Sequence, residues 1–444
     1  MRKEDSDHDA AHNFRLPPRT GFLLLYNCFL SLFSLSIRIY GLFNSKAKKW
    51  IDGRKDWERN INGALQPGDK RIWIHCSSMG EFEQAKPLAE TLKQQFSGYK
   101  IVITFFSPSG FEACKRNEIV DYVFYLPIDS KINAERFIAL IEPSLVLFVK
   151  YEFWYYYLAQ LHKQGIPVAL VSGAFREGQV FFKWYGGLFR DMLRCFSFFF
   201  LQDDQSKKML HKIGLDNNIL ISGDTRYDRV SVIAKNITPI TAIEQFKGQN
   251  KILIAGSTWP GDENVLIECI SLLPIDWKLI IAPHETGETH IRKVQQLFGK
   301  ETILFSELDA ENTGSDKKIL IINNIGMLSR LFACGDIAFI GGGFQKGGIH
   351  NILEPAVFGL PVVFGPIYEK FVEAKELVAL QYVFPVNNAQ DSNAILKKLI
   401  TDEAYRSAIS GSLKKFMQAH TGATHTIINE IIKEGWLEKE AFYK

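Results

Sequence analysis

The sequence contains few of the residue groupings that mark a disulfide scaffold, a metal centre or a nucleic-acid binder. Its six cysteines include no CxxC pair or short repeated spacing, which indicates reduced cytosolic residues. No HExxH is present and the ten histidines do not fall at metal-ligand spacing, so we predict no metal. The net charge is only +3 and no dense basic stripe occurs, which argues against nucleic acid as a partner.

Two nucleotide-binding signatures are also missing. There is no Walker lysine, and the glycines at 341–343 do not form GxGxxG followed by a distant acid. A dinucleotide site therefore fits poorly, and the missing Walker lysine agrees with the prediction of no metal.

Length and composition predict two domains. With 444 residues, of which 46% are apolar and 23% charged, the chain exceeds what one core usually supports. Short β-rich runs alternate with helical stretches between residues 72 and 222, and the alternation starts again at residue 252. We predict doubly wound α/β domains at 45–234 and 251–444 with a linker at 235–250. An alternative is that the last helices return to the first domain.

The N-terminus begins with a polar tail, 1–20, and continues with an apolar segment, 21–44. This segment is about the ~20 residues needed to cross a hydrocarbon core, although Asn27 and Arg38 interrupt it. Positive charges are more numerous after it than before it, which favours a cytoplasmic globular part. We expect a membrane anchor that spans the bilayer or lies in its interface. The alternatives are a signal peptide, which fits less well, and an amphipathic helix covering a groove of the protein itself.

Glu81 is the first candidate for chemistry. A predicted strand breaks at Ser77, Ser78 and Gly80, and a helix starts near Glu81, so this carboxylate lies at the carboxyl edge of a parallel sheet. There it serves either as a general base or simply as a complement to the helix dipole, and the spacing favours neither reading.

Two further βα turns carry polar residues. Ser107, Ser109 and Gly110 present hydroxyls and backbone N–H groups to an anion, although many such turns bind nothing. Glu152 follows another strand among aromatic residues and is either a functional group or a satisfied structural acid, the second being favoured.

The glycine-rich stretch 339–366 is the most specific region. Its glycines let the chain pass close to a phosphate, Asn351 caps the next helix, and Glu354 is placed to accept two ribose hydroxyls. The alternative is a tight turn without a ligand. Gly256, Ser257 and Thr258 are likewise small residues that precede a predicted helix. The segment 223–229 either lines a cleft or closes a loop.

These stretches together resemble one family, the Kdo transferases of lipid A assembly. The resemblance covers almost the whole chain: the apolar segment, then WIHCSSMGE (73–81), SPSG (107–110), EFW (152–154), AGST (255–258) and GGIHNILEPAVFGLPVVFGP (347–366). The chain departs from many members at Pro283 and His284, where they have an arginine–histidine pair, and at SGAFREG (172–178).

The resemblance implies a GT-B fold of two Rossmann-like domains, the first binding the acceptor and the second the nucleotide sugar. It implies transfer of Kdo from CMP-Kdo to the lipid A precursor (lipid IVA), with inversion and with Glu81 as the catalytic base. The enzyme would lie at the cytoplasmic face of a bacterial inner membrane. Membrane lipids would be further partners, and no cofactor is expected. The expected substrate-binding residues are Ser107, Ser109, Gly110, Gly256, Ser257, Thr258, Pro283, His284, Ile325, Gly326, Met327, Gly348, Asn351, Ile352, Leu353 and Glu354.

Two other functions share parts of this pattern. A nucleotide-sugar epimerase uses the same paired architecture but has no obvious need for the apolar segment. A noncatalytic membrane scaffold would explain that segment but not Glu81 and Glu354.

Overall fold

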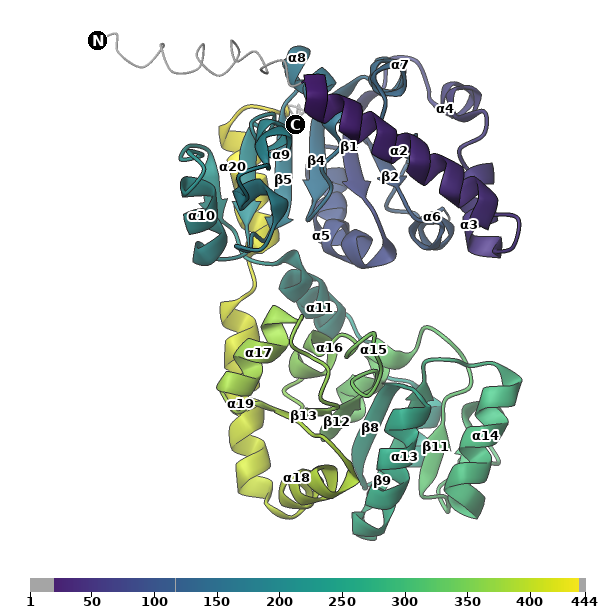
Figure 1. Ribbon diagram of the computed structural model, residues 1–444. Coiled ribbons are helices and arrows are strands. Elements are labelled where there is room, and N and C mark those ends of the chain that lie inside the picture. The colour runs from purple at the N-terminus through teal and green to yellow at the C-terminus, as the bar shows by residue number, and fades with distance from the viewer. Residues whose placement is uncertain (1–19, 116, 439–444) are drawn as a thin grey trace, which may run out of the picture. The chain divides into compact units, whose positions relative to one another are not determined.

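Two compact α/β units make up the chain. The computed structural model describes residues 20–115 and 117–438; unit 1 comprises the chain up to Arg229 together with residues from Gly422 onward, and unit 2 comprises Val230–Thr421. Each unit has a twisted parallel sheet with helices packed against it (Figure 1). The predicted fold class, paired doubly wound domains, is confirmed. Except for Thr20, the tail predicted at 1–20 lies outside the described residues.

Within the described residues, the sheet of unit 1 has seven parallel strands in the order β3-β2-β1-β4-β5-β6-β7. Nearly continuous apolar runs form the central strands, as expected where both faces of a sheet are covered. The strands are β1 (Lys70–Cys76), β2 (Tyr99–Phe105), β3 (Tyr122–Tyr125), β4 (Pro143–Val149), β5 (Val168–Gly173), β6 (Phe198–Leu201) and β7 (Ile219–Ile221).

The alternation of side chains along these strands divides the core of unit 1 in two. Ile72 and Ile74 pack into one cluster with helix α5, whereas Trp73 points to the other cluster. The helices of unit 1 are α2 (Thr20–Tyr40), α3 (Ser45–Asp52), α4 (Trp57–Ala64), α5 (Met79–Gln95), α6 (Pro108–Cys114), α7 (Lys131–Ile141), α8 (Tyr155–Lys163), the short η1 (Val180–Phe182), α9 (Gly187–Leu193), α10 (Asp204–His211) and α20 (Ala423–Lys433).

Helix α2 corresponds to the apolar segment and packs on unit 1 with one face. Buried or half-buried side chains recur every three or four residues, which is the period of one helical stripe; they are Leu23, Tyr26, Leu30, Phe33 and Ile37. The Tyr26 hydroxyl donates a 2.6 Å hydrogen bond to Asp129. The same carboxylate accepts hydrogen bonds from the backbone N–H groups of Tyr156 and Tyr157. Part of α2 therefore belongs to the fold of unit 1.

The other face of α2 carries large apolar side chains in contact with solvent. Leu25 is 68% exposed, Phe29 63% and Leu32 64%. By length and composition, Gly21–Tyr40 would suffice to cross a membrane. The combination of a fixed inner stripe and an apolar outer face is typical of a helix that lies in a membrane interface.

Helix α20 returns to unit 1 near the end of the chain, and packs against α5 (Figure 1). Asp228 fixes its start, because its two carboxylate oxygens accept 2.6 Å hydrogen bonds from the N–H groups of Gly422 and Thr424. These N–H groups stand at a helix N-terminus and have no partner within the helix. Within the segment 223–229, Asp228 therefore closes the fold.

Unit 2 also has a parallel sheet, with seven strands in the order β10-β11-β9-β8-β12-β13-β14 among the described residues. The strands are β8 (Lys251–Thr258), β9 (Trp277–Pro283), β10 (Thr302–Leu304), β11 (Ile319–Ile321), β12 (Ile337–Ile340), β13 (Val362–Phe364) and β14 (Val383–Pro385). The helices are α12 (Thr241–Lys247), α13 (Pro260–Cys269), η2 (Ile270–Leu272), α14 (Glu288–Phe298), η3 (Gly299–Glu301), η4 (Phe305–Glu307), α15 (Leu328–Leu331), η5 (Phe332–Cys334), α16 (Leu353–Ala356), α17 (Val372–Ala379), α18 (Ala389–Thr401) and α19 (Glu403–Ala419).

The stretch 235–250, for which the sequence predicts a linker, contains helix α12. Ile243 and Phe246 of this helix are buried. The division between the units falls within the preceding helix, α11 (Thr225–Lys235).

Candidate active site

The predicted site residues of each unit gather at the carboxyl edge of its sheet, next to the point where the strand order reverses. In unit 1 this point lies between β1 and β4, and in unit 2 between β8 and β12. Ligands of open α/β sheets bind at such points, because the loops on either side diverge and leave room. Glu81 follows β1 and Glu152 follows β4, whereas Ser257 ends β8 and Gly341 follows β12.

Glu81 lies in the first turn of α5 and is held by the turn before it. Its carboxylate accepts a hydrogen bond from the N–H of Ser77, which is the last residue before the N-cap Ser78. Burial, followed by the negative charge of Glu152, raises the pKa of Glu81. A carboxylate with a raised pKa is a stronger base than an exposed one, which suits it to accept a proton.

Glu152 is fixed at the end of a chain of hydrogen bonds that runs through the core. Trp73 Nε1 donates to Thr104 Oγ1 at 2.7 Å, and Thr104 Oγ1 lies 2.8 Å from His75 Nδ1. His75 Nε2 is 3.0 Å from Glu152 Oε2, and His75 is completely buried. Because the Thr104 hydroxyl accepts from Trp73, its own proton is available to His75 Nδ1, which leaves the Nε2 proton for Glu152.

The pKa values of the two carboxylates are consequently shifted in opposite directions. Burial alone would raise the pKa of Glu152, but hydrogen bonds from His75, Trp154 and Ser77 hold it below its usual value. Trp154 Nε1 donates to Glu152 Oε2 at 2.8 Å. The negative charge of Glu152 beside Glu81 keeps the basicity of Glu81 high. Two acids with different environments are the usual sign of divided roles. Glu152, which the sequence left between a functional and a structural reading, is a hydrogen-bonded acid that influences Glu81.

The turn after β2 carries the serines predicted to meet substrate. Ser107 Oγ and Ser109 Oγ lie 3.0 Å apart, and Ser107 N–H donates to the carbonyl of Ser77, in the turn before Glu81. Gly110 has a packing role, because a Cβ at this position would stand 2.2 Å from the Phe105 ring. The two hydroxyls therefore lie beside the Glu81 turn, whereas Gly110 lets α6 approach the sheet.

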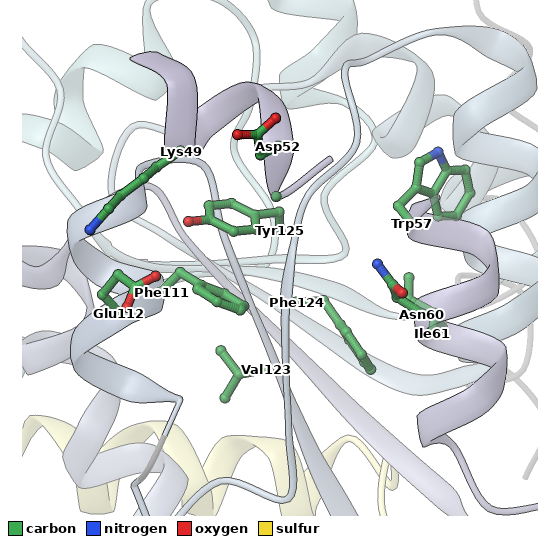
Figure 2. A pocket seen from close by; sticks show the side chains of 11 residues that line it. Lys49, Asp52, Trp57, Asn60, Ile61, Phe111, Glu112, Val123, Phe124 and Tyr125 are labelled. Carbon is green, nitrogen blue, oxygen red and sulfur yellow. The ribbon is translucent and has the colours of Figure 1, made fainter. Parts of the chain in front are cut away.

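A cavity of about 460 Å³ opens on the other side of α6 (Figure 2). Aromatic and aliphatic side chains form its walls, with Phe111 stacked on Tyr125 at 4.2 Å between ring centroids. Lys49, Asp52 and Glu112 supply the charges at its rim. None of the predicted site residues lines this cavity, so we assign the chemistry to the carboxylates at the sheet edge.

In unit 2, Asp262 joins two of the predicted loops. Its Oδ2 accepts hydrogen bonds from Trp259 N–H at 2.9 Å and from Gly342 N–H at 2.8 Å. Burial raises its pKa to about 6. Gly341 is required where the loops meet, because a Cβ there would lie 2.3 Å from the Ser257 carbonyl oxygen. Sequence reasoning missed Asp262, which holds the Ser257 turn against the glycine loop.

Several predicted substrate-binding residues of this unit have structural contacts instead. Thr258 Oγ1 donates to the buried Glu263 at 3.1 Å. A Cβ on Gly256 would lie 2.8 Å from Leu328. The side chains of Ile352 and Leu353 are in the core. At these positions only the backbone remains for a ligand.

Three aromatic rings form a stack beside these loops. The ring of His284 lies 4.6 Å from that of Trp259 and 4.7 Å from that of His350. Trp259 Nε1 donates to His350 Nε2 at 3.2 Å, and burial with nearby His284 lowers the pKa of His350 to about 4. His350 is therefore neutral near pH 7, and the exposed His284 ends the stack. Pro283, just before His284, is buried. The sequence named His284 but not its two partners.

Glu354 is held by two neighbours. Ser329 Oγ donates to its Oε2 at 2.8 Å, and Asn351 Nδ2 donates to its Oε1 at 3.2 Å. Asn351 Oδ1 also accepts from Leu353 N–H at 3.1 Å, so Asn351 contacts the first residue of α16, although the N-cap residue is Ile352 and not Asn351. Ser329 comes from α15 and was not foreseen from the sequence.

The remaining predicted residues occupy loops at the same sheet edge. Ile325 is 82% exposed, and Gly326 has a φ of 89°, which favours glycine. Met327 lies directly before α15. Gly348, with a φ of 77°, lies in the glycine loop after β12. Among residues 20–115 and 117–438, no group of three histidine, cysteine, aspartate or glutamate side chains is arranged to hold a metal.

Two doubly wound units, each with polar groups at its reversal point, define a GT-B-type fold. Solved structures agree with the fold. UDP-GlcNAc 2-epimerase from Neisseria meningitidis, bound to UDP-GlcNAc, superposes with a TM-score of 0.58 at 15% identity, over 82% of this chain and 100% of the epimerase. At this identity the likeness shows the fold alone.

Sequence relatives specify the activity. A family model described as 3-deoxy-D-manno-octulosonic-acid transferase (kdotransferase) matches residues 53–229. The 3-deoxy-D-manno-octulosonic acid transferase of Haemophilus influenzae is 28% identical over 409 residues, which cover 88% of this chain and 93% of the relative. A bifunctional glycosyltransferase/methyltransferase of Fusobacterium nucleatum is 26% identical over 73% of this chain, which spans only 51% of that relative. Residues 53–229 thus match the Kdo transferase family model, and most of the chain is similar to Kdo transferases, which are glycosyltransferases of lipopolysaccharide synthesis.

Proposed function

We propose that this enzyme transfers Kdo from CMP-Kdo to the lipid A precursor lipid IVA, with inversion at the anomeric carbon and Glu81 as general base. The observation that carries the proposal is the pair of carboxylates in unit 1. Glu81 has a raised pKa next to Glu152, which is held ionised by His75 and Trp154. Similarity to Kdo transferases supports the choice of donor and acceptor.

The step that we assign to Glu81 is a single displacement. Its carboxylate takes the proton of an acceptor sugar hydroxyl while the hydroxyl oxygen forms a bond to the anomeric carbon of Kdo. The bond between that carbon and the phosphate oxygen of CMP breaks at the same time, and CMP leaves with the electron pair. Glu152 acts through Glu81, since its negative charge makes proton transfer to Glu81 more favourable.

We assign donor binding to unit 2. The backbone N–H groups near Ser257 and in the loop 341–348 would hold the single phosphate, as glycine-rich turns do for anions. Glu354 would accept hydrogen bonds from the ribose, and the exposed ring of His284 offers a flat surface to the base. A monophosphate leaving group does not demand a cation, so the proposal includes no metal or other cofactor.

We further propose that the enzyme lies at the cytoplasmic face of the bacterial inner membrane. The exposed apolar face of α2 would enter the interface, and its inner stripe would keep the helix attached to unit 1. Lys46 and Lys48 on the following helix are exposed and would attract anionic membrane lipids.

One assay tests this function directly. Purified enzyme is incubated with labelled CMP-Kdo and lipid IVA, together and separately, and the labelled products are identified. Label in lipid only when both substrates are present supports the transferase. Conversion of CMP-Kdo without lipid would instead point to an activity on the nucleotide sugar, and no turnover in any mixture would contradict the proposal.

Replacing Glu354 by alanine is expected to raise the KM for CMP-Kdo by roughly tenfold with a smaller change in kcat. A ribose contact is made in both the ground state and the transition state, so its loss weakens donor binding rather than the chemical step. Glu311→Ala, which changes another exposed acid of unit 2, is the matched control. An unchanged donor KM together with poorer use of the acceptor would move the nucleotide site elsewhere.

Replacing Glu152 by glutamine is expected to shift the acid limb of the pH–rate profile to lower pH. The negative charge of Glu152 raises the pKa of Glu81, so its removal lets Glu81 ionise at lower pH and makes it a weaker base at neutral pH. The measurement is kcat against pH for both enzymes. An acid limb at the wild-type position would show that Glu152 does not influence the titrating group.

A further inference from the structure

A polar groove runs along the inner side of α2 in unit 1. Two cavities, of about 360 Å³ and 620 Å³, share Ser34, Arg38, Ile128 and Asn133 among their lining residues. They therefore adjoin and form one groove between α2, α3 and the start of α7, which we call the α2–α7 groove. Neither cavity includes Glu81 or any residue expected to bind the nucleotide.

The α2–α7 groove contains two cations that the protein itself does not neutralise. Arg38 and Lys131 line it, and both are exposed. In the described part of the chain, no carboxylate and no hydrogen-bond acceptor pairs with either side chain. Two more cations line the smaller cavity: Lys55 is engaged at 2.6 Å by Asp52, and Arg54 donates hydrogen bonds to three backbone carbonyls.

The carboxylate that lines the groove, Asp129, already has hydrogen-bond partners. Asp129 accepts hydrogen bonds from the Tyr26 hydroxyl and from the N–H groups of Tyr156 and Tyr157. It is 2% exposed, so it does not meet Arg38 or Lys131 in an ion pair. The groove therefore presents an excess of positive charge to any ligand.

The rest of the lining combines neutral hydrogen-bonding groups with apolar side chains such as Leu35 and Ile132. Ser31 and Ser34 of α2 contribute hydroxyls. Trp50 lines the smaller cavity, and its Nε1 is buried without a hydrogen-bond partner in the described structure. A buried donor with no acceptor is costly, and a bound ligand that supplies one would remove the cost. Cations, hydroxyls and an unpaired donor together suit a phosphorylated sugar better than an apolar chain.

The position of the groove defines what kind of molecule carries this group. Its wall is α2, whose opposite face exposes Leu25, Phe29 and Leu32. A ligand with a polar headgroup and apolar chains would reach the groove with its headgroup while its chains stay beside the outer face of α2. The Trp50 ring, which lines the smaller cavity, lies 5.5 Å from that of Phe106, which precedes the Ser107 turn, so the groove adjoins the edge where Glu81 lies.

We propose that the α2–α7 groove binds a phosphate group on the sugar headgroup of the lipid acceptor, through Arg38 and Lys131. The proposal rests on the proposed function and adds to it the subsite that orients the acceptor. Arg38 lines both cavities and Lys131 lines the larger one, and a guanidinium and an ammonium in one groove match a phosphate by charge-assisted hydrogen bonds.

The test uses the full-length enzyme in detergent micelles with two acceptors, the phosphorylated lipid and the same lipid after removal of its headgroup phosphates. The double variant Arg38→Gln, Lys131→Gln should raise the KM for the phosphorylated acceptor roughly tenfold or more, with kcat and the donor KM nearly unchanged. With the dephosphorylated acceptor, wild type should already show the raised KM, and the variant should add nothing.

The matched control is Lys163→Gln, Lys212→Gln, which removes the same charge from exposed positions of unit 1 outside the groove. An equal KM effect in this control would overturn the proposal in favour of general attraction to anionic micelles. An unchanged acceptor KM in the groove variant, with weaker binding to phosphatidylglycerol vesicles, would assign the groove to bulk phospholipid instead.

A failure of the proposed function gives a different result. If wild type transfers no sugar from any mixture, binding of the phosphorylated lipid without donor is measured by equilibrium titration. Weaker binding of the groove variant than of wild type retains the phosphate subsite without the proposed reaction, and equal binding contradicts the subsite itself.

Discussion

Replacing Glu81 by glutamine is expected to lower kcat by roughly 10²–10⁴-fold, the range observed when a general base is lost. Glutamine keeps the shape and still accepts a hydrogen bond from Ser77 N–H, so the turn before α5 should remain. It does not accept a proton at neutral pH. Donor affinity should stay at the wild-type value, because we assign CMP-Kdo to unit 2. The measurement is kcat with saturating substrates, together with equilibrium binding of CMP.

The control for this variant is Glu90→Gln, which changes an acid further along the same helix, and it should keep nearly full turnover. Turnover of Glu81→Gln within a few-fold of wild type would rule out the base assignment. A parallel loss of CMP binding would also speak against it, because it would indicate a disturbed fold rather than a missing base.

The pH dependence provides an independent check on the same residue. A base works only when deprotonated, so the rate of wild type should fall as the pH drops through the pKa of Glu81. Burial and Glu152 raise that pKa, so the fall should begin at a higher pH than for an ordinary glutamate. In Glu81→Gln the residual rate should no longer follow this limb.

Deleting residues 1–44 is expected to unfold or strongly destabilise unit 1, while unit 2 continues to bind nucleotide. The deletion removes the stripe that includes Leu23, Tyr26 and Leu30, and it leaves the Asp129 carboxylate without the Tyr26 hydroxyl. Loss of the buried Leu30, of several half-buried apolar side chains and of one part-buried hydrogen bond costs on the order of 5 kcal/mol. This is a large part of the roughly 5–15 kcal/mol that stabilises a typical domain. Calorimetry should show the transition of unit 1 lowered or absent.

A matched variant separates folding from membrane attachment. Leu25→Gln, Phe29→Gln, Leu32→Gln changes only exposed side chains on the outer face of α2. This protein should keep the wild-type melting profile but leave the membrane fraction, and its activity should fall more with acceptor in bilayers than with acceptor in detergent. A deletion variant that melts like wild type would show that α2 is a dispensable tether. Membrane retention of the triple variant would contradict insertion of the outer face.

Much of the architecture follows from local patterns in the sequence. Apolar runs such as IVITFF (101–106) and KLIIAP (278–283) read as buried parallel strands, and both are strands in the structure. The position of Glu81 was also predictable, because a strand, two serines and a helix start in succession fix the carboxylate at the sheet edge. The hydrogen bond from Leu353 N–H to Asn351 is likewise a contact between residues close in the chain. These features depend on neighbours in sequence, which the sequence shows directly.

The orientation of α2 was decided by the tertiary structure. Composition indicates an apolar helix, but every turn of it is apolar, so periodicity alone does not say which face is covered. The choice comes from Asp129, 103 residues away from Tyr26, and from the Phe106 ring near Phe33. Such contacts exist only after strands β2 and β3 have brought their carboxyl ends to one edge.

The tertiary structure also decided the electrostatics of the site. His75 and Glu152 are 77 residues apart, and Thr104 meets His75 because β1 pairs with β2 in a register that places these two residues side by side. Trp259 reaches His284 and His350 because β8 lies between β9 and β12, and Ser329 reaches Glu354 although β11 and β12 are not neighbours in the sheet. The sequence by itself therefore determined the two-domain fold and the residue types at the sheet edges. The tertiary structure alone decided which acid is held ionised and which has its pKa raised, because pKa values depend on burial and on charges that are distant along the chain.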